Sequence, residues 1–183
     1  VGIDGPSATG FGAGVSRVTI GQDVIAVATH DALGSFVTVR EAFVAGKPGH
    51  VSFEEAATLP LAFLTAYHGL HTLAAVRPGD RVLIHAAAGG VGLIVCQWAR
   101  ALGATVIGTV SSDEKAALAK AHGCDHAIIY TRENFVERVR EITGGKGVRV
   151  VYDSIGQDTF MGSLECLRPL GMMVLFGAAS GPV

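Results

Sequence analysis

The sequence lacks the features that mark membrane and nucleic-acid-binding proteins. Its 14 Lys and Arg residues are spread among 16 acidic residues. They form no basic stripe with interleaved aromatic residues of the kind that binds a phosphate backbone. Apolar stretches are short: residues 56–67, one of the longest, are interrupted by Thr58 and Pro60 and are too few to cross a membrane. We therefore expect neither nucleic acid nor a membrane as a partner.

Cysteine is also scarce. Cys96, Cys124 and Cys166 are odd in number, widely spaced and set in apolar patterns, which argues against a disulfide framework and predicts reduced core thiols in a cytoplasmic protein. His68 and His71 are three residues apart on an expected helix, but no Cys, Asp or Glu has the spacing to complete a metal site with them. We therefore predict that the protein holds no metal ion.

What the sequence does contain is enough apolar material for a substantial core. Of its 183 residues, 49% are hydrophobic and 16% are charged, and the formal net charge is −2. Residues 23–28 and 35–40 are short β-prone runs separated by glycine and turn residues, so residues 1–50 are expected to be rich in β-structure. Because the sequence starts at Val1 within such a segment, we expect a fragment or an excised domain.

Residues 51–80 have the pattern of a helical connection. Ser52 and Glu55 form a capping box, in which each side chain satisfies a free backbone N–H of the other residue and starts a helix. Pro60 is expected to end or bend this helix, because proline lacks the N–H that the helical hydrogen-bond ladder needs. Residues 64–73 are expected to form another helix, closed by a turn at residues 77–80.

From Arg81 onward, strands and helices alternate. Continuous apolar runs predict strands at residues 82–85, 105–110, 127–130, 148–152 and 172–176. Apolar residues at helical spacing predict helices at residues 91–102, 113–122, 133–143 and 158–167. This alternation predicts an α/β fold with a Rossmann-type doubly wound parallel sheet, in which ligands lie across the carboxyl ends of the strands.

A glycine-rich turn follows the first of these strands. Ala87, Gly89 and Gly92 take the three positions of the G-x-G-x-x-G pattern. These positions serve a tight turn, the close approach of a pyrophosphate to the backbone, and the packing of the helix on its strand. Alanine at the first position weakens the pattern, but the preceding strand and the following helix are the context that it requires. A dinucleotide-binding turn is therefore favoured over an ordinary strand-to-helix turn.

The end of the second strand indicates which dinucleotide is bound. NAD-preferring folds place Asp or Glu there, roughly 20 residues beyond the glycines, to bind the ribose hydroxyls. This sequence has Ser111 and Ser112 instead, with Lys115 one turn into the next helix, and Asp113 is interpreted as the N-cap of that helix. Two hydroxyls and a cation suit a 2′-phosphate, so NADP(H) is favoured. The alternative is two ordinary loop serines and a solvated surface lysine.

Four motifs of the sequence resemble those of a known family. The motifs VLIHAAAGGVG, GTVSSDEK, ITGGKGVRVVYDSIG and LFGAASGPV closely resemble those of NADPH-dependent quinone oxidoreductases, members of the zinc-independent medium-chain dehydrogenase/reductase superfamily. Upstream, VSFEEAATLPLAFLTAYHGLH is more similar to the enoylreductase domains of polyketide and fatty acid synthases, which belong to the same superfamily. The resemblance covers nearly the whole chain.

The resemblance implies a domain plan and an activity. Residues 1–50 would be part of a GroES-like β domain, residues 51–80 a helical connection, and residues 81–183 an NADP(H)-binding Rossmann domain without its C-terminal part. The implied activity is hydride transfer from NADPH to a small quinone. Reduction of enones or enoyl thioesters is one alternative, and a non-catalytic NADPH-binding role is another. The full-length protein would be a homodimer, and Leu61 stands where zinc-dependent relatives carry a cysteine ligand.

The resemblance also implies the cofactor contacts. The implied cofactor-binding residues are Ala88, Gly89, Gly90, Val91 and Gly92 at the pyrophosphate, Ser111, Ser112, Lys115 and Tyr130 at the 2′-phosphate and adenosine, and Thr65, Ser154, Phe176 and Gly177 at the nicotinamide end. No catalytic residue can be assigned. His85 is either an acid or base or a hydrogen-bonded strand-end histidine, and Asp153 either orients the nicotinamide ribose or caps a turn. Tyr67 either faces a cleft or packs in the core.

Overall fold

In the computed structural model, residues 8, 10, 12, 14–28 and 34–183 are described. They divide into two compact units, Val1–Leu64 and Thr65–Val183. In the first unit, β1 (Val24–Ala26) and β2 (Val44–Gly46) pair antiparallel, and the short helix η1 (Glu41–Phe43) precedes β2. The strand predicted at residues 35–40 is wrong. Most of its side chains are exposed, so its β-propensity has no packing surface to stabilise it.

One continuous helix, α1 (Phe53–Tyr67), runs through Pro60 and is followed by a π-helical segment, η2 (His68–Leu73). The predicted capping box is confirmed, because the Glu55 N–H donates to Ser52 Oγ at 3.1 Å and the Ser52 N–H donates to Glu55 Oε2 at 2.9 Å. The helix does not end at Pro60. Residues 64–73 are helical as predicted, but they are the end of α1 and the segment η2 and not a separate helix. Proline removes a single donor from the ladder, and the residues after it keep theirs.

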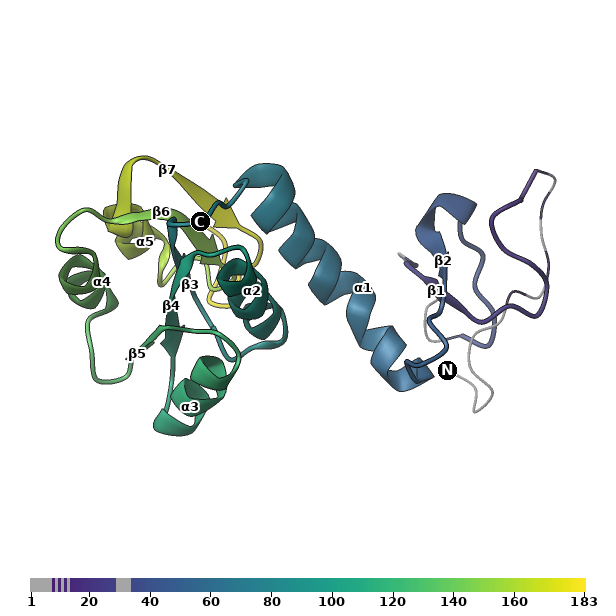
Figure 1. Ribbon diagram of the computed structural model, residues 1–183, viewed down its shortest axis with the longest axis horizontal. Coiled ribbons are helices and arrows are strands. Elements are labelled where there is room, and N and C mark those ends of the chain that lie inside the picture. Colours follow the sequence, from purple (N-terminus) through teal and green to yellow (C-terminus); the bar gives the residue numbers. More distant parts are fainter. Residues whose placement is uncertain (1–7, 9, 11, 13, 29–33) are drawn as a thin grey trace. The chain divides into compact units, whose positions relative to one another are not determined.

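The second unit contains a five-stranded parallel sheet in the order β5-β4-β3-β6-β7 (Figure 1). The strands are β3 (Arg81–Ile84), β4 (Thr105–Val110), β5 (His126–Ile129), β6 (Val148–Asp153) and β7 (Leu167–Leu175). The chain winds outward from β3 through β4 to β5, and then crosses to the other side of β3 for β6 and β7. This order has the switch point of a doubly wound sheet between β3 and β6, as predicted.

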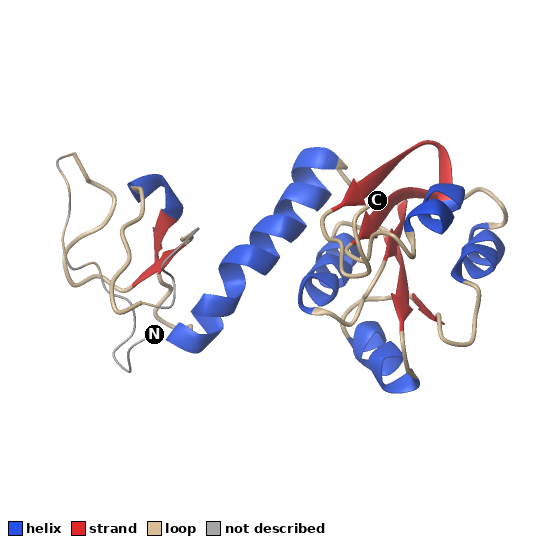
Figure 2. Cartoon of the chain, turned by 180° about the vertical axis from the view of Figure 1, so that it is seen from behind, coloured by secondary structure: helices blue, strands red, loops and turns tan. Residues whose placement is uncertain are grey.

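Helices cover both faces of this sheet (Figure 2). They are α2 (Gly90–Ala101), α3 (Asp113–Ala121), α4 (Phe135–Thr143) and α5 (Phe160–Cys166). Val82 and Val106 belong to the core beneath α2 and α3, whereas Leu83 and Ile107 belong to the core beneath α4 and α5. In β3, β4 and β6, successive residues point to opposite faces and most are buried, which is why these strands are largely apolar.

Two predictions in this unit need correction. Ser112, not Asp113, is the N-cap of α3: its backbone is extended and its Oγ accepts the Lys115 N–H at 3.3 Å. The last strand begins at Leu167 rather than at residue 172, because α5 ends at Cys166. The sheet register is irregular across this added part, where Leu170 has a positive φ of 60°. The predicted core thiols are confirmed, since Cys96, Cys124 and Cys166 are free and buried.

Candidate functional site

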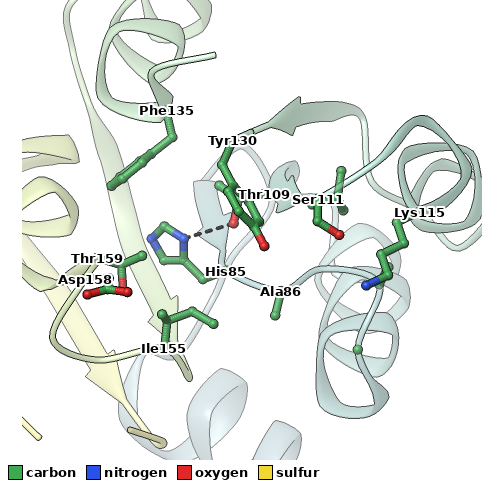
Figure 3. A pocket seen from close by; sticks show the side chains of 13 residues that line it. His85, Ala86, Thr109, Ser111, Lys115, Tyr130, Phe135, Ile155, Asp158 and Thr159 are labelled. Carbon is green, nitrogen blue, oxygen red and sulfur yellow. Dashed lines mark hydrogen bonds between the residues drawn. The ribbon is translucent and has the colours of Figure 1, made fainter. Parts of the chain in front are cut away.

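A cavity of about 470 Å³ opens at the carboxyl ends of β3, β4, β5 and β6 (Figure 3). It lies entirely within the second unit. Its lining residues are His85, Ala86, Ala88, Gly89, Thr109, Val110, Ser111, Lys115, Tyr130, Phe135, Ile155, Asp158 and Thr159. Doubly wound sheets bind ligands at this edge, where the loops on either side of the switch point separate.

The glycine turn forms one wall of the cavity. Ala86 has a φ of 51°, and the Gly89 N–H donates to Ala86 O at 2.8 Å, which closes a tight turn before α2. Gly89 is the N-cap of α2 and supplies no side-chain cap, so the first N–H groups of the helix stay available for an anion. A Cβ at Gly92 would lie 2.2 Å from Ala86 O, whereas a Cβ at Gly90 would meet nothing within 4 Å. Gly92 is therefore the position where helix and turn pack closest.

The alanine at the first position of the pattern is accommodated by a glycine on the next strand. Ala87 is fully buried, and its N–H donates to Thr109 O at 3.0 Å. A Cβ at Gly108 of β4 would lie 2.5 Å from Ala87 Cβ, so the methyl group at the first position occupies the space that Gly108 leaves. Sequence analysis missed Gly108, whose signal was a glycine inside an otherwise apolar strand.

The residues predicted to bind a 2′-phosphate lie at the end of β4 and beginning of α3. Ser111, Lys115 and Tyr130 line the cavity. Ser112 does not line it, because its hydroxyl oxygen caps α3. Asp113 forms two hydrogen bonds with the Arg132 guanidinium, at 2.8 and 2.6 Å, and these bonds lower the pKa of Asp113. The nearby carboxylate is thus neutralised by an arginine that sequence analysis did not single out.

His85 occupies the centre of a buried polar network. Its Nδ1 lies 3.0 Å from Thr109 Oγ1, and its Nε2 lies 2.9 Å from Ser163 Oγ. Ser163 Oγ lies 3.1 Å from Asp153 Oδ2, which also accepts the Thr159 hydroxyl at 2.7 Å. The network therefore joins the ends of β3, β4 and β6 to α5, and His85, Thr109 and Thr159 face the cavity.

The network determines the protonation of His85. Because the Ser163 hydroxyl donates to the Asp153 carboxylate, its oxygen is free to accept the proton of His85 Nε2, and Nδ1 accepts from Thr109. Burial lowers the pKa of His85 to about 4, against an opposing effect of the Asp153 charge. His85 is therefore a neutral hydrogen-bonded histidine on the cavity floor.

Asp153 caps the loop after β6. Its Oδ1 accepts the N–H groups of Ile155 and Gly156, at 2.7 and 3.1 Å, and the side chain is fully buried. The Thr159 and Ser163 hydroxyls occupy its Oδ2, so the buried carboxylate presents no surface to a ribose, which supports the turn-capping alternative. Tyr67 was expected either to face a cleft or to pack in the core. It is half exposed and stacks on His71, with ring centroids 5.0 Å apart.

The residues predicted at the nicotinamide end lie outside this cavity. Thr65 is in α1 and does not line the cavity. The same holds for three residues that were predicted at the pyrophosphate and lie in α2, namely Gly90, Val91 and Gly92. Ser154 and Gly177 are neighbours at the ends of β6 and β7, because a Cβ at Gly177 would lie 2.7 Å from Ser154 O. The Phe176 N–H donates to Asp153 O at 2.9 Å and joins the same two strand ends.

Sequence analysis missed several lining residues. Thr109 and Ile155 were findable, because they lie at or just after the ends of predicted strands. Phe135 is the first residue of α4, and its ring packs edge-on against His85 with centroids 5.0 Å apart. Asp158 and Thr159 carried no sequence signal, since only the loop after β6 brings them to the cavity.

No cluster of three or more His, Cys, Asp or Glu side chains suited to a metal ion occurs among the described residues. His68 and His71 lie in η2, and Leu61 is 82% exposed on α1. Burial raises the pKa of Cys166 to about 12, so its thiol is a poor metal ligand or nucleophile at neutral pH. Within the described residues, no helix is long and apolar enough to span a membrane.

The parallel sheet, its switch point and the glycine turn beside the cavity define a Rossmann-type dinucleotide-binding protein. Residues 90–183, just over half of the chain, match the family described as zinc-binding dehydrogenase, and the chain belongs to that family.

Known relatives agree with this assignment. The quinone oxidoreductase of Salmonella typhimurium is 51% identical over 94% of this chain and 53% of its own length. The crystal structure of Escherichia coli quinone oxidoreductase complexed with NADPH has a TM-score of 0.90 and 46% identity, covering 96% of this chain and 54% of that one. The CurK enoyl reductase has a TM-score of 0.87 and 42% identity, covering 93% and 51%. The chain thus spans about half the length of these relatives.

Proposed function

We propose that this chain binds NADPH and that the protein containing it is an NADPH-dependent reductase. The observation that carries the proposal is the position of Ser111 and Lys115 on the same cavity as the glycine turn. A carboxylate at the end of β4 would repel a 2′-phosphate, and β4 ends in Val110 followed by two serines. The Escherichia coli relative, whose structure is a complex with NADPH, supports the same cofactor.

The residues present fit this cofactor. The first N–H groups of α2 would hold the pyrophosphate, and a Cβ at Gly92 could not be accommodated. Ser111 and Lys115 would bind the 2′-phosphate, and Tyr130 would pack beside the adenosine. Thr65, Ser154, Phe176 and Gly177 remain the proposed residues at the nicotinamide end.

When bound, NADPH would supply a hydride for reduction. The chain's contribution is to fix the cofactor in one orientation and to exclude water from it. We propose a quinone as the acceptor, supported by the relative from Salmonella typhimurium. An enone or enoyl thioester is the second candidate, supported by the CurK enoyl reductase. Either acceptor gains negative charge on oxygen and needs a hydrogen-bond donor there, a role to which we assign none of the described residues.

Fluorescence titration with NADPH and NADH tests the cofactor. A charged contact to a phosphate is typically worth about 1–3 kcal/mol, so NADPH should bind about tenfold to a hundredfold more tightly than NADH. Lys115→Ala should narrow that gap. Lys120→Ala, an exposed lysine of the same helix that does not line the cavity, should leave it unchanged. Equal affinities for the two cofactors in the unmodified chain would refute NADP(H) specificity.

The acceptor is tested with the full-length protein. NADPH oxidation is followed with a quinone and with an enoyl thioester offered separately, and we expect turnover with the quinone. Turnover with the thioester alone would favour the second candidate. Tight NADPH binding without turnover on either would favour the non-catalytic, NADPH-binding alternative.

Partners and location are also proposals. We propose a homodimer in the full-length protein, as the resemblance to quinone oxidoreductases implies. Sedimentation of the full-length protein tests this state. The balanced charge supports the absence of a nucleic-acid partner, and the three free cysteines support a cytoplasmic location.

A further inference from the structure

The cavity carries a single negative side chain, and it lies away from the residues proposed to bind phosphate. Asp158 is the only acid among the lining residues. In Figure 3, Asp158 and Thr159 lie on one side of His85, and Ser111 and Lys115 lie on the other. Because a carboxylate repels phosphates, Asp158 must face an uncharged part of a dinucleotide bound in this cavity.

The loop that carries Asp158 is held in place by its backbone. The Asp158 N–H donates to Ser180 Oγ at 3.0 Å, and that hydroxyl donates to Ile155 O at 2.9 Å. The neighbouring Thr159 hydroxyl donates to the buried Asp153 carboxylate at 2.7 Å. In contrast, the Asp158 carboxylate has no hydrogen bond or ion pair with any described residue. The backbone of Asp158 is therefore held in place, and its carboxylate is available as an acceptor for a ligand.

The chemistry of this end of the cavity selects the group that Asp158 can meet. An ionised carboxylate only accepts hydrogen bonds, so its partner must be a donor. Phe135 and Ile155, which line the cavity near it, provide apolar surface for a planar ring. If Ser111 and Lys115 held the 2′-phosphate, an adenine ring reaching across the cavity toward Asp158 would offer its 6-amino group as the hydrogen-bond donor.

We propose that Asp158 recognises the 6-amino group of adenine and makes the site specific for that base. This inference rests on the proposed binding of NADPH in the cavity. Hypoxanthine carries a carbonyl oxygen in place of the amino group, and that oxygen would face the carboxylate with no donor between them. Asp158 is thus a specificity residue for the base, distinct from the groups that bind the phosphates.

The test compares NADPH with its hypoxanthine analogue, nicotinamide hypoxanthine dinucleotide phosphate, by titration calorimetry. The unmodified chain should bind NADPH about tenfold more tightly than the analogue, as expected for a hydrogen bond to a charged group. In Asp158→Asn the preference should fall to within about twofold, because an amide both donates and accepts. Glu165→Gln, an exposed acid on α5 that does not line the cavity, should keep the full preference.

The possible failures are separable. Equal binding of both dinucleotides by the unmodified chain, or an equal loss of affinity for both in Asp158→Asn, would overturn the role of Asp158. If Lys115→Ala still weakens NADPH binding in that case, the proposed function stands without base recognition. If neither dinucleotide binds, both proposals fail. Asp158 is exposed, so its variants should melt at the temperature of the unmodified chain, which circular dichroism verifies.

Discussion

At the scale of single residues, His85 shows how a buried network makes stability depend on pH. Burial lowers its pKa to about 4, whereas an unfolded chain would protonate it near pH 6.5. As the pH falls from about 6.5 to about 4, His85 becomes protonated in the unfolded state but stays neutral in the folded state. The free energy of unfolding should therefore fall across that window by up to about 3 kcal/mol, and be independent of His85 above it.

Urea unfolding at several pH values between 7 and 4 measures this effect. His85→Gln keeps a donor and an acceptor for Ser163 and Thr109 but cannot titrate. We expect its stability relative to the unmodified chain to improve steadily as the pH is lowered from 6.5. A constant difference between the two proteins at every pH would show that His85 does not carry the proton.

A substitution at Gly89 should affect the binding of NADPH without affecting folding. Its φ of −81° is accessible to any residue, and a Cβ there would lie 3.1 Å from Ala86 O, a tight contact that a small shift relieves. Gly89→Val should therefore fold, yet its branched side chain would occupy the place where a pyrophosphate approaches the backbone. We expect undetectable NADPH binding with a nearly unchanged melting curve. Normal binding by this variant would place the phosphate site elsewhere.

At the scale of elements, the contact between α2 and the turn after β3 depends on Gly92. A Cβ there would lie 2.2 Å from Ala86 O and 2.9 Å from the Ala87 backbone, so helix and turn would have to separate. Overpacking of this kind typically costs about 1–3 kcal/mol, and Gly92→Ala should lower the melting temperature accordingly. Gly90→Ala, two residues away in open space, should leave it unchanged or raise it. Equal melting temperatures for the two variants would contradict this packing.

The elements of the second unit were predictable because the central strands are mostly apolar and buried on both faces, and because Ser112 and Asn134 cap the starts of α3 and α4. β4 matches its predicted bounds, and the ends of α2 and α3 differ by one residue. The first unit was less predictable. Residues 35–40 have β-propensity without a surface to pack on, and Pro60 lies inside a helix that neighbouring hydrogen bonds maintain.

The sequence predicted the site residues that lie close to the ends of predicted strands. It did not predict the residues that the fold brings to the site from distant segments. Gly89 follows β3 within a few residues, and Ser111 and Lys115 follow β4, so their place on the cavity follows from the strand-end rule. Asp158 and Phe135 reach the same cavity from a loop and a helix start that are distant in sequence. Arg132, which neutralises Asp113, likewise depends on the packing of β5 beside β4.

At the scale of the whole molecule, the compact units and the predicted domains are different divisions of the chain. The contact pattern separates Val1–Leu64 from Thr65–Val183, and this boundary falls inside α1. The GroES-like domain at residues 1–50, the connection at 51–80 and the cofactor domain at 81–183 stay predictions.

The metal content of the whole protein is a further prediction, and it runs against the description of the family as zinc-binding. Leu61, on the exposed side of α1, stands where the resemblance places a cysteine ligand, and an aliphatic side chain cannot bind zinc. The three cysteines are buried on separate elements and lack the paired spacing of a structural zinc site. We expect less than stoichiometric zinc by elemental analysis after dialysis. EDTA should change neither the melting temperature nor the affinity for NADPH. One zinc per chain that survives dialysis, with a lower melting temperature once it is removed, would contradict the prediction and move the protein to the zinc-dependent branch of its family.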